Sequence, residues 1–114
     1  CTTCHRPDFD AMPSGVRLYS DLLVHDMGEG LSDAAPDSVG VTAREWRTAP
    51  LWGLSARLGE VARGEIDGLL HDGRARTIEA AIAWHAGEAG AARERYFALS
   101  TQEQSALLDF LSGL

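Results

Sequence analysis

The sequence contains no lysine, few aromatic residues and only two cysteines among its 114 residues. All ten basic residues are arginine, and 17 acidic residues bring the net charge to −7. This balance argues against nucleic acid or an anionic membrane surface as a partner. No stretch approaches the roughly 18 consecutive apolar residues of a membrane-spanning helix, so no membrane span is expected. A zinc site built on four cysteines is excluded by the cysteine count alone.

The two cysteines that are present stand at the start, in the pentapeptide Cys1-Thr2-Thr3-Cys4-His5. Two cysteines three apart, followed directly by histidine, form the attachment motif of a c-type haem. Each thiol adds to a vinyl group on one edge of the porphyrin, and the histidine then reaches the iron. The sequence therefore predicts one covalent haem c held by Cys1 and Cys4, with His5 as the proximal iron ligand.

Other interpretations of the two cysteines stay open at this point. A thioredoxin-like redox motif needs a βαβ context, and the sequence does not alternate in that way. A zinc site would need further ligands from histidines, whose spacing is not typical of such sites. A structural disulfide would suit an oxidising compartment. The histidine directly after the second cysteine favours haem attachment over all three.

Helical patterns dominate the second half of the chain. Thr77 predicts the N-cap of a helix over 78–86, and a second helix is expected over 89–98. Ser100 and Glu103 predict a capping box for the last helix. The residues expected on the buried faces of the first and last of these helices are Ile78, Ala81, Ile82 and His85, and then Leu107, Phe110, Leu111 and Leu114.

The first half carries weaker patterns. Residues 18–28 fit a short helix or a buried extended segment, and 55–65 fit a weak helix or a mobile loop. Thr42 and Glu45 predict a capping box for a short helix that ends at Trp46. The prediction is a single all-α domain over residues 1–114, a cytochrome c-like helical domain wrapped around one covalently attached haem.

The second axial ligand of the iron has several candidates. They are Met12, Met27, His25, His71 and His85. Spacing alone ranks Met27 and His85 about level. His85 has the better geometry, because it should face inward from a capped helix. It is the predicted distal ligand, with Met27 as the alternative.

Four segments resemble one known family. They are residues 18–28, 45–54 and 69–85, and the closing Leu-Leu-Asp-Phe-Leu at 107–111. Together and in this order they resemble the di-haem oxidoreductases, relatives of bacterial di-haem cytochrome c peroxidases and of the methylamine-utilisation di-haem enzyme. The resemblance covers nearly the whole chain and is to the C-terminal haem domain. It implies that the chain is part of a longer exported polypeptide, with an N-terminal haem domain as its partner.

The resemblance also implies roles for individual residues. His85 takes the position of the distal ligand, which is methionine in the peroxidases, and histidine there should lower the potential. Thr48 and Pro50 resemble residues whose backbone carbonyls hold calcium between the two haems, so calcium is expected only in the full-length protein. His71 and Arg74, or Arg76 in its place, correspond to haem-pocket or propionate partners. Residues 52–68 have no counterpart in the peroxidases.

In those relatives the peroxide chemistry occurs at the N-terminal haem, and the C-terminal haem relays electrons. The chain is therefore expected to be the electron-transfer domain of a periplasmic, peroxidase-like di-haem oxidoreductase. Its haem would be six-coordinate, it would carry no catalytic residue, and it would exchange electrons with a redox partner protein. The periplasm follows from haem attachment, which takes place outside the cytoplasm. The alternatives are a free-standing monohaem cytochrome c carrier, a haem enzyme in which His85 dissociates to admit peroxide, and a zinc or disulfide module without haem.

Overall fold

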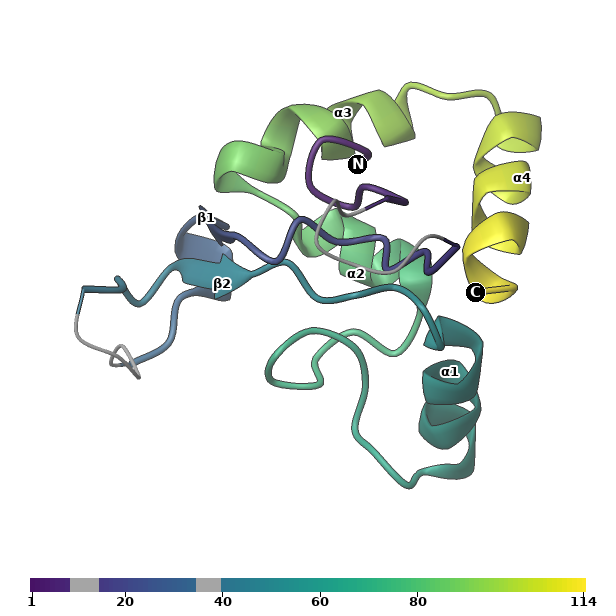
Figure 1. The fold of residues 1–114 in the computed structure, drawn as a ribbon, viewed down its shortest axis with the longest axis horizontal. Helices are drawn as coiled ribbons and strands as arrows, with labels where there is room; N and C mark the ends of the chain where they lie inside the picture. The colour runs from purple at the N-terminus through teal and green to yellow at the C-terminus, as the bar shows by residue number, and fades with distance from the viewer. Residues whose placement is uncertain (9–14, 35–39) are drawn as a thin grey trace. The chain divides into compact units, whose positions relative to one another are not determined.

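The computed structural model describes residues 1–8, 15–34 and 40–114 (Figure 1). Met12 lies outside the described residues. The chain divides into two compact units, and each has its own buried residues. The first unit comprises Cys1–Trp52 and His85–Ala92, and the second comprises Gly53–Trp84 and Arg93–Leu114. The single-domain assignment over 1–114 stays a prediction.

The first unit contains a small antiparallel sheet of two strands. Strand β1 (Val24–Asp26) pairs with β2 (Glu45–Arg47), and His25 lies opposite Trp46 in the register. A short 3₁₀ helix, η1 (Glu29–Leu31), lies between the strands in sequence. The all-α prediction was therefore wrong: the described residues form a small mixed fold of four α-helices and a two-stranded sheet. Strands of three residues are too short to display a period-two pattern, so periodicity could not reveal them.

The capping box predicted at Thr42 also leads to a strand rather than a helix. The Glu45 side chain accepts a hydrogen bond from the Thr42 backbone N–H at 2.6 Å, and the Glu45 N–H donates to the Thr42 carbonyl at 3.0 Å. These bonds close a turn. The chain then extends, because Glu45–Arg47 finds its backbone partners on β1. The predicted helix ending at Trp46 was wrong, although its local hydrogen bonds form.

The interior of the first unit is partly polar. Its buried residues are Leu18, Leu31, Ser20, Asp21 and Thr48. The indole N–H of Trp46 donates to the Leu31 carbonyl at 2.7 Å and so attaches the sheet to η1. The extended alternative for residues 18–28 is the correct one, since β1 is the only regular element there.

The second unit is helical. It contains α1 (Leu54–Arg63), α2 (Ile78–Trp84) and α4 (Thr101–Ser112). The residues of α3 (Gly90–Phe97) are divided between the two units. Helices α1 and α2 both pack against α4. The core consists of Leu54, Leu69, Ala75 and Ile78, with Leu108, Leu111 and Leu114 of the C-terminal segment against it. The helical alternative for 55–65 is thus confirmed. No described helix is long and apolar enough to span a membrane.

The helix caps predicted at Thr77 and Ser100 are confirmed, but two details of the helices differ. The Thr77 hydroxyl accepts from the Ala80 N–H at 3.1 Å, and Ser100 with Glu103 forms a complete capping box. Phe110, expected in the core, is half exposed. Helix α2 ends at Trp84, so His85 follows the helix instead of lying on its buried face. The backbone leaves the helical region at Ala86, with φ −133° and ψ −161°.

Candidate functional site

The opening pentapeptide forms one tight turn. The His5 N–H donates to the Cys1 carbonyl at 2.9 Å, which is the i to i−4 bond of an α-helical turn, and the Cys4 N–H donates to the same oxygen at 3.2 Å. Residues at i, i+3 and i+4 share one face of such a turn. Cys1, Cys4 and His5 are therefore presented on the same side. This is the arrangement that two thioethers and an axial ligand to one haem require.

The His5 ring is oriented by the backbone. Its Nδ1 lies 3.0 Å from the Tyr19 carbonyl oxygen, which can only accept, so Nδ1 carries the proton. Burial lowers the pKa of His5, which outweighs the opposing effect of the Tyr19 hydrogen bond. The neutral ring then keeps a lone pair on Nε2. A metal-bound histidine has this pattern, in which the other ring N–H is held by a carbonyl or carboxylate.

His85 lies across from His5 within the first unit. The two ring centroids are 6.4 Å apart, and the ring planes are inclined by 48°. Two imidazoles that bind one metal ion from opposite sides, at about 2.0 Å per metal–nitrogen bond, have centroids roughly 6.3 Å apart. The observed centroid separation is close to that value. The donors present therefore fit a haem.

His25 is held between two carboxylates. Its Nε2 lies 2.8 Å from Asp21 Oδ2, and its Nδ1 lies 2.9 Å from Glu88 Oε2. The Glu88 and Asp21 hydrogen bonds raise the pKa of His25, and His25 in turn lowers the pKa of Glu88. Burial acts to raise the pKa of Asp21, but hydrogen bonds from Leu23 and His25 outweigh it and lower the pKa. Both nitrogens of His25 are thus engaged, which argues against its use as an iron ligand.

Cys4 lies close to the pair formed by His25 and Asp21. Single ligand atoms of Cys4, Asp21 and His25 all lie within 4.8 Å of one another. Burial, followed by the charge of Asp21, raises the pKa of the Cys4 thiol. Redox-active cysteines have lowered pKa values, so the environment of Cys4 is the opposite of a thioredoxin-like site. The three groups could hold a metal ion only if Cys4 were not joined to haem and His25 released Asp21.

Met27, the alternative distal ligand, directly follows β1. Its backbone N–H donates to the Arg44 carbonyl at 2.9 Å, which continues the pairing of the two strands. The residue is half-buried. Its role as a ligand stays a prediction.

The two residues predicted to hold calcium lie just after β2. Thr48 is buried, and its carbonyl oxygen accepts a hydrogen bond from the Ser20 hydroxyl at 2.7 Å. Pro50 is half-buried. A carbonyl oxygen has two lone pairs and is a hard ligand of the kind that calcium prefers. The calcium assignment stays a prediction.

His71 and Arg74 belong to the second unit. Arg74 pairs with Asp72, and its guanidinium lies 4.6 Å from the centre of the Trp84 ring. His71 Nε2 is 3.9 Å from Asp72 Oδ2. Asp72 thus stands between the two residues expected in the haem pocket. Their assignment to a haem pocket stays a prediction.

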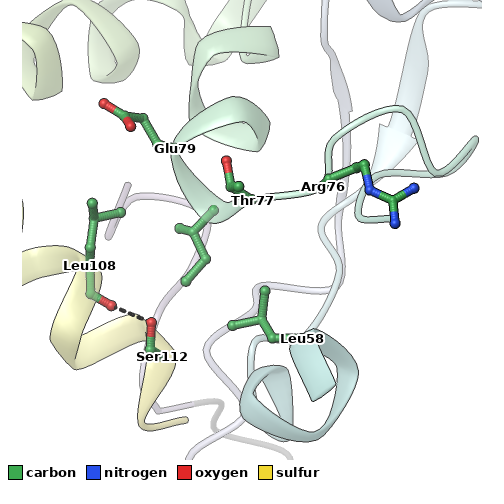
Figure 2. A pocket seen from close by; sticks show the side chains of 7 residues that line it. Leu58, Arg76, Thr77, Glu79, Leu108 and Ser112 are labelled. Carbon is green, nitrogen blue, oxygen red and sulfur yellow. Dashed lines mark hydrogen bonds between the residues drawn. The ribbon is translucent and has the colours of Figure 1, made fainter. Parts of the chain in front are cut away.

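The second unit also has an open hollow of about 310 Å³ (Figure 2). Leu58, Ile78 and Leu108 supply its apolar lining, and the other lining residues are Arg76, Thr77, Glu79 and Ser112. The Ser112 hydroxyl is turned back to the Leu108 carbonyl at 2.8 Å, as Figure 2 shows. Of the residues considered as haem-pocket partners in the sequence, Arg76 lines it, whereas His71 and Arg74 do not.

The neighbouring His5 and His85 rings and the Cys-x-x-Cys turn are of the residue types that haem-binding proteins use as donors. Comparison with protein families makes this specific. The family described as "Di-haem oxidoreductase, putative peroxidase" matches residues 1–114. The chain therefore belongs to the di-haem oxidoreductase family, as its sequence blocks indicated. No curated protein and no solved structure gives a significant match.

Three residues of the site were missed in the sequence. Tyr19, Asp21 and Glu88 orient His5 or engage His25. Asp21 stands four residues before His25, a spacing that could have suggested a pair. Tyr19 acts through its carbonyl, and Glu88 is 63 positions from His25, so neither leaves a pattern in the sequence.

Proposed function

We propose that this chain is the electron-transfer haem domain of a periplasmic di-haem oxidoreductase. In this proposal the haem is attached covalently through Cys1 and Cys4, and its iron is held by His5 and His85. The observation that carries the proposal is the 6.4 Å separation of the two imidazole rings. Family membership supplies the haem and the oxidoreductase class.

Each residue has a physical task in this function. Bound haem supplies reversible one-electron chemistry at its iron. The Tyr19 carbonyl fixes the His5 ring and its tautomer, and the lowered pKa of His5 keeps that ring neutral and able to bind metal. His85 fills the opposite side and leaves no open position for peroxide. Two imidazole ligands also favour a lower potential than a histidine and methionine pair.

The same proposal assigns a place in a larger protein. An N-terminal haem domain of the same polypeptide would carry out the peroxidase-like chemistry, and a redox partner protein would exchange electrons with it. A calcium ion held by the Thr48 and Pro50 carbonyls would belong to that full-length protein. The acidic surface suits a partner with a basic docking face, because opposite charges speed association.

The deciding experiment is the absorption and EPR spectrum of the haem-loaded protein beside its His85→Met variant. The unsubstituted protein should be low-spin with the signature of two imidazole ligands. His85→Met should lose that signature and show a higher potential. Met27→Leu serves as the matched control and should leave both unchanged. If Met27→Leu changes the spectrum while His85→Met does not, the assignment of His85 is wrong.

Covalent attachment is tested separately. Cys1→Ser and Cys4→Ser should each leave haem joined through one thioether, which shifts the pyridine haemochrome band. The double variant should release its haem into acidified organic solvent. Haem that stays bound after both substitutions would contradict the covalent assignment. A second Cys-x-x-Cys-His upstream in the gene would support the di-haem protein, and its absence there would support the monohaem carrier.

A further inference from the structure

The residue that faces His5 is carried by a short segment with little regular structure. His85 and Ala86 lie between α2 and the 3₁₀ helix η2 (Gly87–Ala89). His85 directly follows Trp84, the last residue of α2, and so lies beyond the end of the helix. Within the first unit, the residues that follow His85 in η2 contact strand β1.

Glu88 supplies one attachment, three residues after His85. Its carboxylate makes two contacts with β1: Oε1 accepts from the Asp26 backbone N–H at 3.0 Å, and Oε2 lies 2.9 Å from His25 Nδ1. Hydrogen bonds to charged groups are stronger than neutral ones. Glu88 thus ties the segment to the strand through a fork of two bonds.

The backbone of the same segment is pressed against the strand. A Cβ added to Gly87 would stand 2.2 Å from the Asp26 carbonyl oxygen and 2.8 Å from the Gly28 nitrogen. Gly87 also has φ +53°, a conformation that favours glycine. Such close backbone approach lets the short Glu88 side chain span the gap to His25.

The opposite end of the bridge reaches the segment that orients His5. Asp21 is buried, its Oδ2 lies 2.8 Å from His25 Nε2, and its Oδ1 accepts from the Leu23 N–H at 3.0 Å. Two residues earlier, the Tyr19 carbonyl accepts from His5 Nδ1. The segment 19–21 therefore orients His5 through the Tyr19 carbonyl. The same segment contacts His25 through Asp21, and His25 in turn pairs with Glu88.

We infer that Asp21, His25 and Glu88 form a positioning bridge that holds His85 opposite His5. The inference rests on the proposed function, since it concerns the placement of the proposed distal ligand. His25 is then a positioning residue and not an iron ligand. Loss of the bridge frees His85 to leave the metal more often, which opens the sixth position to an external ligand.

The test uses haem-loaded protein with Glu88→Gln and His25→Gln, and cyanide as the probe. Glu88 is exposed, so Glu88→Gln should fold; its amide oxygen can still accept from Asp26 but loses the charged bond to His25. The rate of cyanide binding, well below the melting temperature, should rise about tenfold or more, the order expected when a hydrogen bond to a charged group is lost. His25→Gln should act in the same direction, and the double variant should add little to either single change.

Glu29→Gln is the matched control. Glu29 is an exposed acid of the same unit, and its carboxylate pairs with Arg44 at 2.8 Å. Its substitution should leave the cyanide rate unchanged. If Glu88→Gln and His25→Gln bind cyanide as slowly as the parent while His85→Met still changes the spectrum, the positioning role is overturned and the proposed ligation stands. A spectrum that His85→Met leaves unaltered overturns both.

Discussion

The Oγ of Ser20 donates a hydrogen bond of 2.7 Å to the carbonyl oxygen of Thr48, 28 residues further along the chain. Ser20 Oγ in turn accepts a hydrogen bond from the Leu22 N–H at 2.9 Å, and Ser20 is fully buried. One hydroxyl thus joins the segment before β1 to the residue after β2. It lies in the segment that contains Tyr19 and Asp21, which contact His5 and His25 respectively.

Ser20→Ala should lower the free energy of unfolding. The substitution leaves the Leu22 N–H and the Thr48 carbonyl without this partner in a buried place, and such losses cost about 1–3 kcal/mol. Denaturant unfolding provides the measurement. Ser105→Ala, on the exposed side of α4, is the matched control and should change stability by less than about 0.5 kcal/mol. Equal effects of the two variants would contradict the buried role of Ser20.

Gly87→Ala should disturb the segment that carries His85. The added methyl group would meet the Asp26 carbonyl oxygen at 2.2 Å, and the positive φ adds strain. Gly64→Ala separates the two effects, because Gly64 has φ +72° and nothing within 4 Å of the added atom. We expect Gly64→Ala to cost about 1–2 kcal/mol from strain alone and Gly87→Ala to cost more. Only Gly87→Ala should change the visible spectrum of the haem-loaded protein.

Tyr96→Phe should stabilise the protein. Tyr96 is buried, and among the described residues its hydroxyl has no hydrogen-bond partner. Burial, reinforced by the charge of Glu79, raises the pKa of this hydroxyl. Removing it retains the edge-to-face contact with Phe97 and should gain about 1 kcal/mol in thermal or denaturant unfolding. A clear loss of stability would show that the hydroxyl has a partner in solution.

The capping box of α4 should make part of the stability depend on pH. Hydrogen bonds from the Ser100 side chain and backbone lower the pKa of Glu103 below its usual 4.5. A lowered folded-state pKa means that the stabilisation is present above the unfolded value and is lost as the pH falls through the folded value. The difference in unfolding midpoint between the parent and Glu103→Ala should therefore be largest near neutral pH and shrink in acid. A difference that stays constant down to acid pH would contradict this role.

The parts of this protein that the sequence predicted correctly depend on neighbours within four residues. The caps at Thr77 and Ser100 form because each side chain meets a backbone N–H one turn away. The turn of Cys1 to His5 is equally local, and the covalent haem attachment that its motif indicates stays a prediction. The family membership followed from the same order of motifs.

Tertiary contacts decided the rest. The bonds between Thr42 and Glu45 are compatible with a helix, but β1 supplied strand partners and Glu45–Arg47 became β2. Periodicity placed His85 on a helix that in fact ends at Trp84, and the residue that anchors its segment, Glu88, pairs with a histidine 63 positions away. The spacing of side chains within one helix or strand cannot predict a partner so distant in the sequence. The sequence thus supplied the predicted iron ligands, which stay a prediction, whereas the 6.4 Å separation of the His5 and His85 rings became visible only in the fold.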